Sequence, residues 1–480
     1  MSDTGVTVKK SVDFSEWYVE VVLKAELADY APVKGCMIIR PDAYAVWERI
    51  QEVVNQKIKV TGHRNAYFPM FIPEVFLKRE AEHFEGFTPE VAWITQGGDT
   101  PLEEKLAVRP TSETIMYSMY AKWIRSWRDL PLKINQWCNI VRWETKATKL
   151  FLRTREFLWQ EGHTAHATAE ECEAEVMWAI NMYKDVIENT LAIPVLIGTK
   201  SESEKFAGAL YTTALESIMP DGKALQMGTS HNLGQHFAKV FDVKYIGEDK
   251  ADHYVWQSSW GITTRLIGAM IMVHGDDKGL IMPPKVAPTQ IVIVPIPFKG
   301  QEAEAIATKT KEISEMLKVK GLSVVLDDRQ EYTPGWKFNQ WELKGVPIRI
   351  ELGPRDLKNE QVVIVRRDTG QKTIVKEADI PNAIDKLLQD IQDNMLTKAK
   401  TILQEKITAV KSYDEFKQVL ESKGGFIKAT WCRNPNCETK IKEETGATIR
   451  IIPFEKEEPH KGCIYCGEEG KDVAYFAKSY

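Results

Sequence analysis

The sequence contains no apolar stretch that approaches the roughly 18–20 residues needed to span a bilayer. Its first residues also lack the apolar segment of a secretion signal. We therefore expect a cytoplasmic protein that has no membrane partner.

Several nucleotide-binding and nucleic-acid signatures are missing as well. There is no Walker loop and no Gly-x-Gly-x-x-Gly after a first strand, which weighs against P-loop and Rossmann nucleotide sites. The net charge is −5, so the chain as a whole is not basic, and an RNA partner would have to be met by local basic patches. Internal repeats and low-complexity tracts are absent too.

Cysteine is scarce, with seven in the chain, and the odd number argues against a secreted disulfide framework. Four of them lie near the end of the sequence in two pairs, with spacings typical of a zinc site: Cys432, Cys437, Cys463 and Cys466. We expect a structural Zn²⁺ on these thiolates. His460 is a possible substitute ligand, and the alternative is four unrelated buried cysteines.

What the sequence does contain is a globular composition, 43% hydrophobic and 27% charged, with room for two or three domains. Apolar periodicity predicts strands in the centre and helices on the flanks, which favours an antiparallel α+β domain over a doubly wound parallel one. The predicted helices are 13–27, 42–61, 169–191 and 264–274, and the predicted strands are 35–40, 66–73, 132–141, 155–160, 237–245 and 254–261.

A proline-rich segment at 283–288 reads as a linker. After it, strands and helices alternate in the manner of a compact α/β domain, and a mostly helical stretch over 380–423 leads to the cysteines. We therefore predict domains at 1–285, 286–395 and 396–480, the last a small α/β domain that holds zinc.

The most informative segment begins with Arg142 and Glu144. If both lie on a strand, their side chains project to the same face. A polar hairpin over 145–152 then returns to Arg153 and Phe157. Two guanidinium groups for phosphates, a carboxylate for an amine and an aromatic ring for a base make a nucleotide site.

This pattern resembles motif 2 of class II aminoacyl-tRNA synthetases. Neighbouring segments narrow the resemblance to the prolyl-tRNA synthetase family of the archaeal and eukaryotic-like type: RPTSE at 109–113, QEGHTAH at 160–166, GTSHNLGQ at 228–235 and WGITTR at 260–265. The resemblance runs from about Phe14 to Tyr480. It implies a class II catalytic domain, an α/β anticodon-binding domain and a C-terminal module.

The family's chemistry implies ATP-dependent ligation of proline to tRNA(Pro) through prolyl-adenylate, with Mg²⁺ accompanying the ATP. Arg142 and Arg265 would be catalytic. The resemblance implies this ATP-binding set: Arg142, Glu144, Arg153, Phe157, Gln226, Thr229 and Arg265. Taken alone, Arg265 would read as a surface salt-bridge residue.

For proline, the resemblance and the residue types indicate a carboxylate for the imino group and apolar walls for the ring. The expected residues are Thr111, Glu113, Arg142, Trp159, Glu161, His163 and Phe206. His163 and His166 form an alternative, weak metal pair. Because a small apolar pocket separates near-isosteres poorly, alanine and cysteine are expected as misactivated substrates.

Three further features come from the resemblance. The large editing insertion of bacterial-type relatives is absent between Phe157 and Arg265, which implies no inserted editing domain. The helix and strand over 41–73 resemble motif 1, which implies a homodimer; an ordinary amphipathic helix is the alternative. Tyr480 matches the family's terminal tyrosine, so we expect it to approach the catalytic domain, with a frayed end as the alternative.

Contacts with the anticodon are the least defined part of the site. Glu342 and Arg366 are our candidates among the charged residues of the second domain.

Two other functions remain open. A catalytically dead paralogue that binds RNA would usually have lost an arginine or the stacking aromatic, and all are present here. A sister synthetase for threonine or histidine is disfavoured by the RPTSE and QEGHTAH segments.

Overall fold

The protein is described by a computed structural model that covers residues 5–83, 90–143, 147–296, 301–459 and 462–480. Its centre is one continuous sheet with the strand order β20-β21-β23-β22-β9-β10-β11-β14-β8-β7-β3. From β9 to β7 every neighbouring pair is antiparallel, which confirms the predicted α+β fold. The strands are β3 (Arg64–Asn65), β7 (Leu132–Val141), β8 (Glu156–His166), β9 (Leu196–Thr199), β10 (Tyr211–Ile218), β11 (Ala224–Gly234), β14 (Trp256–Thr263), β20 (Ile407–Ala409), β21 (Phe426–Trp431), β22 (Thr448–Pro453) and β23 (Asp472–Ala477).

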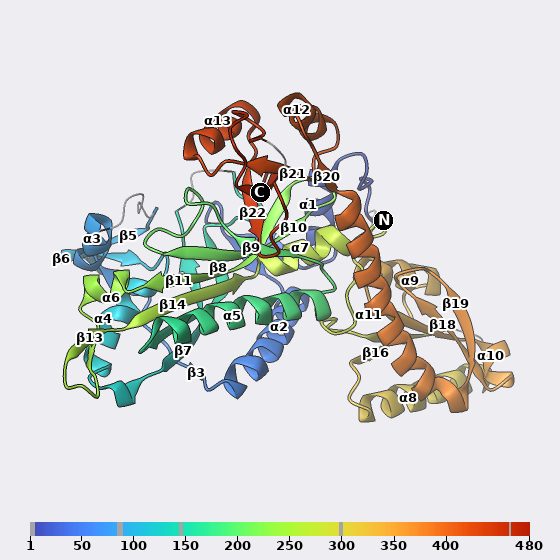
Figure 1. The fold of residues 1–480 in the computed structure, drawn as a ribbon. Helices are drawn as coiled ribbons and strands as arrows, with labels where there is room; N and C mark the ends of the chain where they lie inside the picture. Colours follow the sequence, from blue (N-terminus) through green and yellow to red (C-terminus); the bar gives the residue numbers. More distant parts are fainter. Residues whose placement is uncertain (1–4, 84–89, 144–146, 297–300, 460–461) are drawn as a thin grey trace.

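Helices cover this sheet where the sequence predicted apolar stripes. Two long helices, α2 and α5, lie together along one side of β8, β11 and β14 in Figure 1. On α2 the side chains at steps of four, Val46, Ile50, Val54 and Ile58, are all buried. The helices that share the main core are α1 (Phe14–Lys24), α2 (Pro41–Val60), α5 (Ala169–Asn189) and α7 (Arg265–His274).

Smaller elements surround the central sheet. A three-stranded sheet has the order β4-β6-β5, and two hairpins pair β1 with β2 and β12 with β13. Their bounds are β1 (Ala28–Tyr30), β2 (Met37–Ile39), β4 (Phe71–Pro73), β5 (Trp93–Gly97), β6 (Thr100–Val108), β12 (Lys244–Ile246) and β13 (Asp252–Tyr254), with helices α3 (Glu74–His83), α4 (Glu113–Trp123), α6 (His236–Phe241) and a 3-10 turn at Trp127–Asp129.

The predicted strand over 237–245 is wrong. Its first part is the helix α6, because Phe237, Ala238 and Phe241 point into the core at helical spacing. Asp242, with φ of 56°, ends the helix in the left-handed conformation, and only then does β12 begin. A run of aromatic and aliphatic residues this short does not separate a strand from a buried helix.

The predicted strand over 66–73 is also only partly right. The chain is extended as β3 before it and as β4 at its end, and the residues between are not paired as a strand. Pro69 has no amide hydrogen to give to a ladder, which interrupts the pairing. Phe68 instead donates its amide to the side chain of Gln136 at 2.6 Å.

A second sheet follows the proline-rich linker, with the order β16-β15-β17-β18-β19. Its β15 is parallel to both neighbours, whereas β17, β18 and β19 are antiparallel. This unit has its own apolar core. Its elements are β15 (Ile291–Pro295), α8 (Gln301–Val319), β16 (Val324–Leu326), α9 (Pro334–Leu343), β17 (Ile348–Leu352), α10 (Pro354–Lys358), β18 (Gln361–Arg366), β19 (Lys372–Lys376) and a 3-10 turn at Glu377–Asp379.

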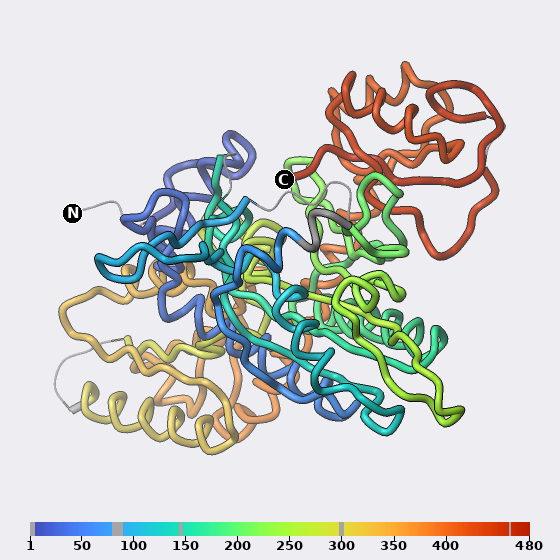
Figure 2. Tube along the Cα trace, turned by 90° about the vertical axis from the view of Figure 1, so that its left-hand side faces the viewer, coloured from blue at the N-terminus to red at the C-terminus, as the bar shows by residue number. Residues whose placement is uncertain are grey.

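A long helix, α11 (Ile380–Glu405), joins this sheet to the C-terminal module (Figure 1). That module contains α12 (Tyr413–Ser422), α13 (Pro435–Thr445) and strands β20 to β23, and it lies away from the second sheet in Figure 2. Its β22 pairs directly with β9, Ile452 opposite Thr199. A Cβ added at Gly198 would be 2.1 Å from the carbonyl oxygen of Ile452, so this junction requires glycine.

Within the described ranges, no helix combines the length and the apolar character needed to cross a membrane.

Candidate active site

One face of β8 carries four of the predicted site residues, because alternate side chains of a strand share a face: Phe157, Trp159, Glu161 and His163. The register continues this face across the sheet. Glu161 lies opposite Gly261 of β14, which lies opposite Thr229 of β11. Since Gly261 has no side chain, this row leaves room above the sheet.

A cavity of about 270 Å³ opens over that face. Every predicted ATP- or proline-binding residue that the structure describes lines it: Thr111, Glu113, Arg142, Arg153, Phe157, Trp159, Glu161, His163, Phe206, Gln226, Thr229 and Arg265. Glu144 falls outside the described residues. Segments far apart in the sequence therefore meet at one site.

Three guanidinium groups, those of Arg142, Arg153 and Arg265, border one part of the cavity. Arg265 donates to the carbonyl oxygens of Leu152 at 3.2 Å and Gln226 at 3.4 Å. Burial, together with the charges of Arg153 and Arg142, lowers the pKa of Arg265 to about 10. The group stays cationic at neutral pH, so this part of the cavity suits a polyanion.

The backbone around Arg142 differs from the prediction. β7 ends at Val141, so strand alternation does not orient Arg142. Its Nε instead donates to the carbonyl oxygen of Pro110 at 3.2 Å, and its Cζ lies 5.8 Å from the centre of the Phe157 ring. The predicted polar hairpin is also wrong at its end, because the apolar residues 150–152 are buried in the main core.

Glu161 and His163 form a buried ion pair at the other part of the cavity, with Oε2 and Nε2 2.9 Å apart. Ser112 and Gln136 donate to the other oxygen of Glu161 at 2.5 and 2.8 Å. Burial acts to raise the pKa of Glu161, but the bonds and charge of His163 and the other donors outweigh it and hold the pKa below its usual value. Burial acts to lower the pKa of His163. The hydrogen bond to Glu161 and the charge of Glu113 outweigh burial, so the pKa of His163 is raised.

The remaining proline candidates complete this part of the cavity. Thr111 donates its hydroxyl to Glu113, and both are buried. The Phe206 ring lies 4.8 Å from that of His231, which burial holds neutral by lowering its pKa to about 3. His231 lines the cavity but was not predicted as a site residue. Its position within GTSHNLGQ was the available signal.

The alternative metal pair of His163 and His166 does not form. His163 is bonded to Glu161, whereas His166 Nε2 lies 2.8 Å from the hydroxyl of Thr164. Burial lowers the pKa of His166 to about 4.

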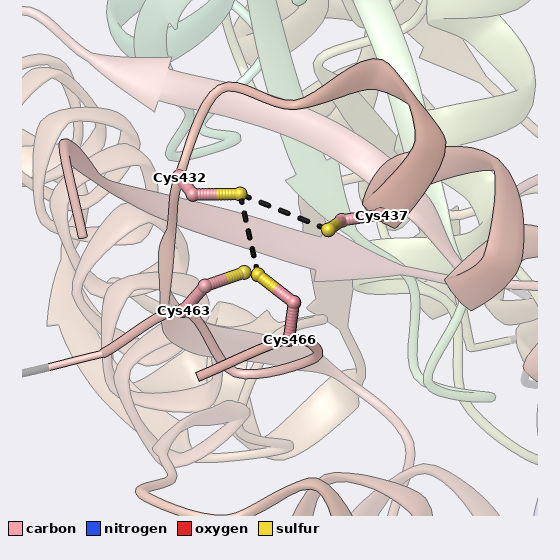
Figure 3. A group of neighbouring side chains, drawn as sticks. All are labelled: Cys432, Cys437, Cys463 and Cys466. Atoms are coloured by element: carbon pink, nitrogen blue, oxygen red, sulfur yellow. Dashed lines mark hydrogen bonds between the residues drawn. The ribbon is translucent and has the colours of Figure 1, made fainter. Parts of the chain in front are cut away.

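The four predicted cysteines do meet (Figure 3), with Sγ atoms that all lie within 4.8 Å of one another. Cys432 Sγ is 3.7 Å from that of Cys437 and 3.8 Å from that of Cys466. Four thiolates around zinc at about 2.3 Å are separated by about 3.8 Å, so these residues fit a tetrahedral Zn²⁺. His460 lies outside the described residues.

The two anticodon candidates line a separate cavity of about 210 Å³ beside the second sheet. Glu342 pairs with Arg349 at 3.2 Å and with Lys278 at 3.2 Å, and Arg366 pairs with Asp368 at 2.8 Å. Both carry protein counter-charges, so a nucleic-acid ligand would compete with these pairs.

Tyr480 approaches the cavity as expected. Its main-chain oxygen accepts from Arg153 Nη2 at 3.3 Å, and its amide donates to Ala224 at 3.2 Å.

Comparisons with known proteins agree with this geometry. Residues 94–274 match the family model "tRNA synthetase class II core domain (G, H, P, S and T)", 290–388 match "Anticodon binding domain", and 413–480 match "Prolyl-tRNA synthetase, C-terminal". The chain is 57% identical to a "Proline--tRNA ligase" of Natranaerobius thermophilus over 98% of this chain and 97% of the relative. An archaeal "Proline--tRNA ligase", of Cenarchaeum symbiosum, is 52% identical over 99% of each chain.

Proposed function

The chain belongs to the proline–tRNA ligases, a family of class II aminoacyl-tRNA synthetases, and on that premise we propose that it joins proline to tRNA(Pro) in two steps. In the first, the proline carboxylate attacks the α-phosphorus of ATP, and pyrophosphate leaves. In the second, the 3'-terminal adenosine hydroxyl attacks the prolyl carbonyl, and AMP leaves. The observation that carries the proposal is the single cavity that joins an arginine-lined part to the Glu161–His163 pair.

The three arginines stabilise the transition state in which proline is activated. Negative charge accumulates on the phosphates in the transition state, so fixed cations aimed at them lower the barrier without a protein nucleophile. Arg142 contacts the α-phosphate and the proline carboxylate, and Arg153 with Arg265 holds the distal phosphates. Phe157 stacks on adenine, Glu144 orients the ATP, and Gln226 and Thr229 contact the nucleoside. The phosphates of ATP would hold the accompanying Mg²⁺, which would neutralise part of their charge.

Thr111, Glu113, Glu161 and His163 bind the imino end of proline. A secondary ammonium has one positive charge and two hydrogens to donate, which the buried carboxylate of Glu113 fits. Trp159 and Phe206 form the apolar walls for the ring.

Alanine and cysteine are misactivated substrates in this proposal, because an apolar pocket gains only about 1–3 kcal/mol per methylene. No inserted editing domain removes the resulting products. This proposal is supported by residues 157–265, all of which the structure describes. Their long strands belong to the central sheet and their long helix packs on it, which accounts for this stretch without an inserted domain.

The remaining parts of the chain serve tRNA binding and assembly. Domains at 1–285, 286–395 and 396–480 act in catalysis, anticodon binding and structural support by Zn²⁺ on Cys432, Cys437, Cys463 and Cys466. Glu342 and Arg366 contact the anticodon. A homodimer forms through the segment at 41–73, where Tyr44, Tyr67 and Phe71 are exposed. The enzyme acts in the cytoplasm, where thiolates remain reduced.

The test is ATP–pyrophosphate exchange with each of the twenty amino acids, without tRNA. We expect proline to lead, with weaker exchange for alanine and cysteine. Arg142→Ala and Arg265→Ala should each lower proline-dependent exchange by about 10²-fold or more, as loss of a fixed transition-state donor does elsewhere.

Arg355→Ala is the matched control, because Arg355 is an exposed arginine of the second sheet's unit that lies away from the cavity. It should leave exchange unchanged. Absence of exchange with every amino acid would contradict the proposal and favour a non-catalytic RNA-binding paralogue. Exchange led by threonine or histidine would instead indicate a sister synthetase.

A further inference from the structure

A buried carboxylate of the C-terminal module contacts the segment that forms one wall of the cavity. Glu438 of α13 is 3% exposed, and both of its oxygens accept hydrogen bonds. Ser201 donates to Oε1 at 2.6 Å, and Ser203 donates to Oε2 at 2.9 Å. A buried carboxylate is costly unless it is bonded in this way, so the contact is specific rather than incidental.

The segment that these serines begin leads directly to the cavity. Glu204, Lys205 and Phe206 all line it. The amides of Glu204 and Lys205 both donate to the carbonyl oxygen of Ser201, at 3.2 and 3.0 Å, which makes a tight turn. The turn therefore transmits the position of Ser201 to Phe206, whose ring packs against His231 at the proline end of the cavity.

On its other side, Glu438 adjoins the four-cysteine cluster of the C-terminal module. It follows Cys437, a member of the four-cysteine cluster, within the first turns of α13. The start of the segment is held as well, because the buried Lys200 donates to Glu216 at 2.6 Å and to the carbonyl oxygen of Arg450 at 2.9 Å.

Among the described residues an ion pair also joins α13 to the segment, Lys442 with Glu204 at 3.5 Å. The Lys442 side chain is 60% exposed, and exposed pairs of this kind contribute little. Of these contacts between α13 and the segment, the buried bonds of Glu438 are therefore the stronger.

We propose that Glu438 is a positioning residue for proline binding, one that holds the turn at Ser201 so that Phe206 forms the wall of the proline end. This inference rests on the proposed function. It assigns the cysteine-bearing module a role in the amino-acid site, apart from any contact with tRNA.

The experiment compares Glu438→Ala, Glu438→Gln and the control Glu443→Ala in full-length protein. Glu443 lies on the same helix, but its side chain is 58% exposed and pairs only with Lys440 among the described contacts. Proline-dependent ATP–pyrophosphate exchange gives KM for proline, KM for ATP and kcat for each. Zinc content and urea unfolding show whether the module remains folded.

We expect Glu438→Ala to raise the KM for proline by about tenfold or more, since hydrogen bonds to a charged group are lost. The KM for ATP and the zinc content should stay near those of the unmodified protein. Glu438→Gln keeps an oxygen acceptor, so its KM for proline should stay near that of the unmodified protein. Glu443→Ala should leave the KM for proline unchanged.

Unchanged KM for proline in Glu438→Ala would overturn the inference, and so would an equal rise in both KM values. If Glu438→Ala does not fold, Ser201→Ala and Ser203→Ala remove the same bonds from the other side and must show the same selective rise. Absence of proline-dependent exchange in the unmodified protein would contradict the proposed function instead, so the two failures are distinguishable.

Discussion

Arg153 and Tyr480 are 327 residues apart in the sequence and meet at the edge of the cavity, where the guanidinium donates to the main-chain oxygen of Tyr480 at 3.3 Å. Two ammonium groups lie over the Tyr480 ring, those of Lys149 at 5.5 Å and Lys223 at 5.2 Å from its centre. Its hydroxyl donates to Asp221 at 2.7 Å. The side chain of Tyr480 therefore anchors the main-chain group that orients Arg153.

Tyr480→Ala removes this anchor, and we expect it to raise the KM for ATP by about fivefold, since each cation–π contact contributes about 0.5–1 kcal/mol. The KM for proline should change less, because Arg153 lies away from the Glu161–His163 pair. Tyr480→Phe is the matched control. It keeps the ring contacts with both lysines and loses only the bond to Asp221. A KM for ATP that is the same in all three proteins would show that Arg153 needs no such anchor.

The pH dependence of stability follows from Glu161 and His163. Folding raises the pKa of His163, so the stabilisation from its protonation is fully present below the unfolded pKa, about 6.5, and is lost as pH rises through the higher folded value. Folding lowers the pKa of Glu161. The stabilisation that its ionised carboxylate contributes is therefore present above the unfolded pKa, about 4.3, and is lost as pH falls through the lower folded value. The ion pair therefore stabilises the fold most between the two unfolded pKa values, about pH 4.3 to 6.5.

We expect His163→Gln to cost about 1.5–3 kcal/mol of unfolding free energy at pH 6, as loss of a charged hydrogen bond does. The difference from the unmodified protein should shrink as pH rises through the raised pKa of folded His163, because the charged pair is then lost. Urea unfolding at a series of pH values measures it. His231→Gln is an informative comparison: burial already keeps His231 neutral, so its cost should not shrink over this range. A pH-independent difference for His163→Gln would contradict a charged pair.

Local pattern predicted most of the catalytic fold, and the reasons are visible in particular elements. Apolar residues at steps of four located α2, and strand β7 was predicted with its observed bounds. Failures occurred where the pattern was too short to have a period, as at α6, and where Pro69 interrupted a strand that otherwise read as extended. The hairpin of β10 and β11 was not predicted, although β11 supplies Gln226 and Thr229 to the cavity.

Which residues share the cavity was predictable only through the family resemblance, because their convergence depends on long-range register. No local rule places Thr229 across from Gly261, or Gly261 across from Glu161. The contact of Glu438 with Ser201 joins residues that lie on different modules, and nothing in either local sequence indicates it. Contacts between residues so distant in sequence can be identified only from the folded structure.

The cysteine cluster predicts a stoichiometric metal. Zinc analysis by mass spectrometry should find about one Zn²⁺ per chain, because four thiolates at tetrahedral spacing form a closed structural site. Cys463→Ser should lower the zinc content and destabilise the C-terminal module, since metal binding contributes directly to folding. Cys36→Ser is the control, because Cys36 lies outside the cluster. Full stability of the Cys463→Ser protein without zinc would mean that the apolar core of the module suffices.

Gly162 gives the sharpest test of how the sheet supports the site. It lies between Glu161 and His163 on β8, and its Cα hydrogen faces the opposite side of the sheet, toward Trp260. A Cβ there would lie 2.2 Å from two indole carbons. Trp260 is 2% exposed, and the rings of His63, Trp178 and Tyr183 pack against its indole and oppose its movement.

Gly162→Ala should therefore destabilise the protein by about 1–3 kcal/mol or more, the usual cost of overpacking a core. The strand must shift away from Trp260, which displaces Glu161 and His163, so the KM for proline should rise as well. Gly335→Ala is the matched control, because nothing lies within 4 Å of a Cβ at that position, at the start of α9. It should be neutral or stabilise by up to about 1 kcal/mol, as alanine does in a helix. Urea unfolding followed by tryptophan fluorescence measures the unfolding free energy of both variants. Equal stability of the two would mean that β8 is not pressed against Trp260.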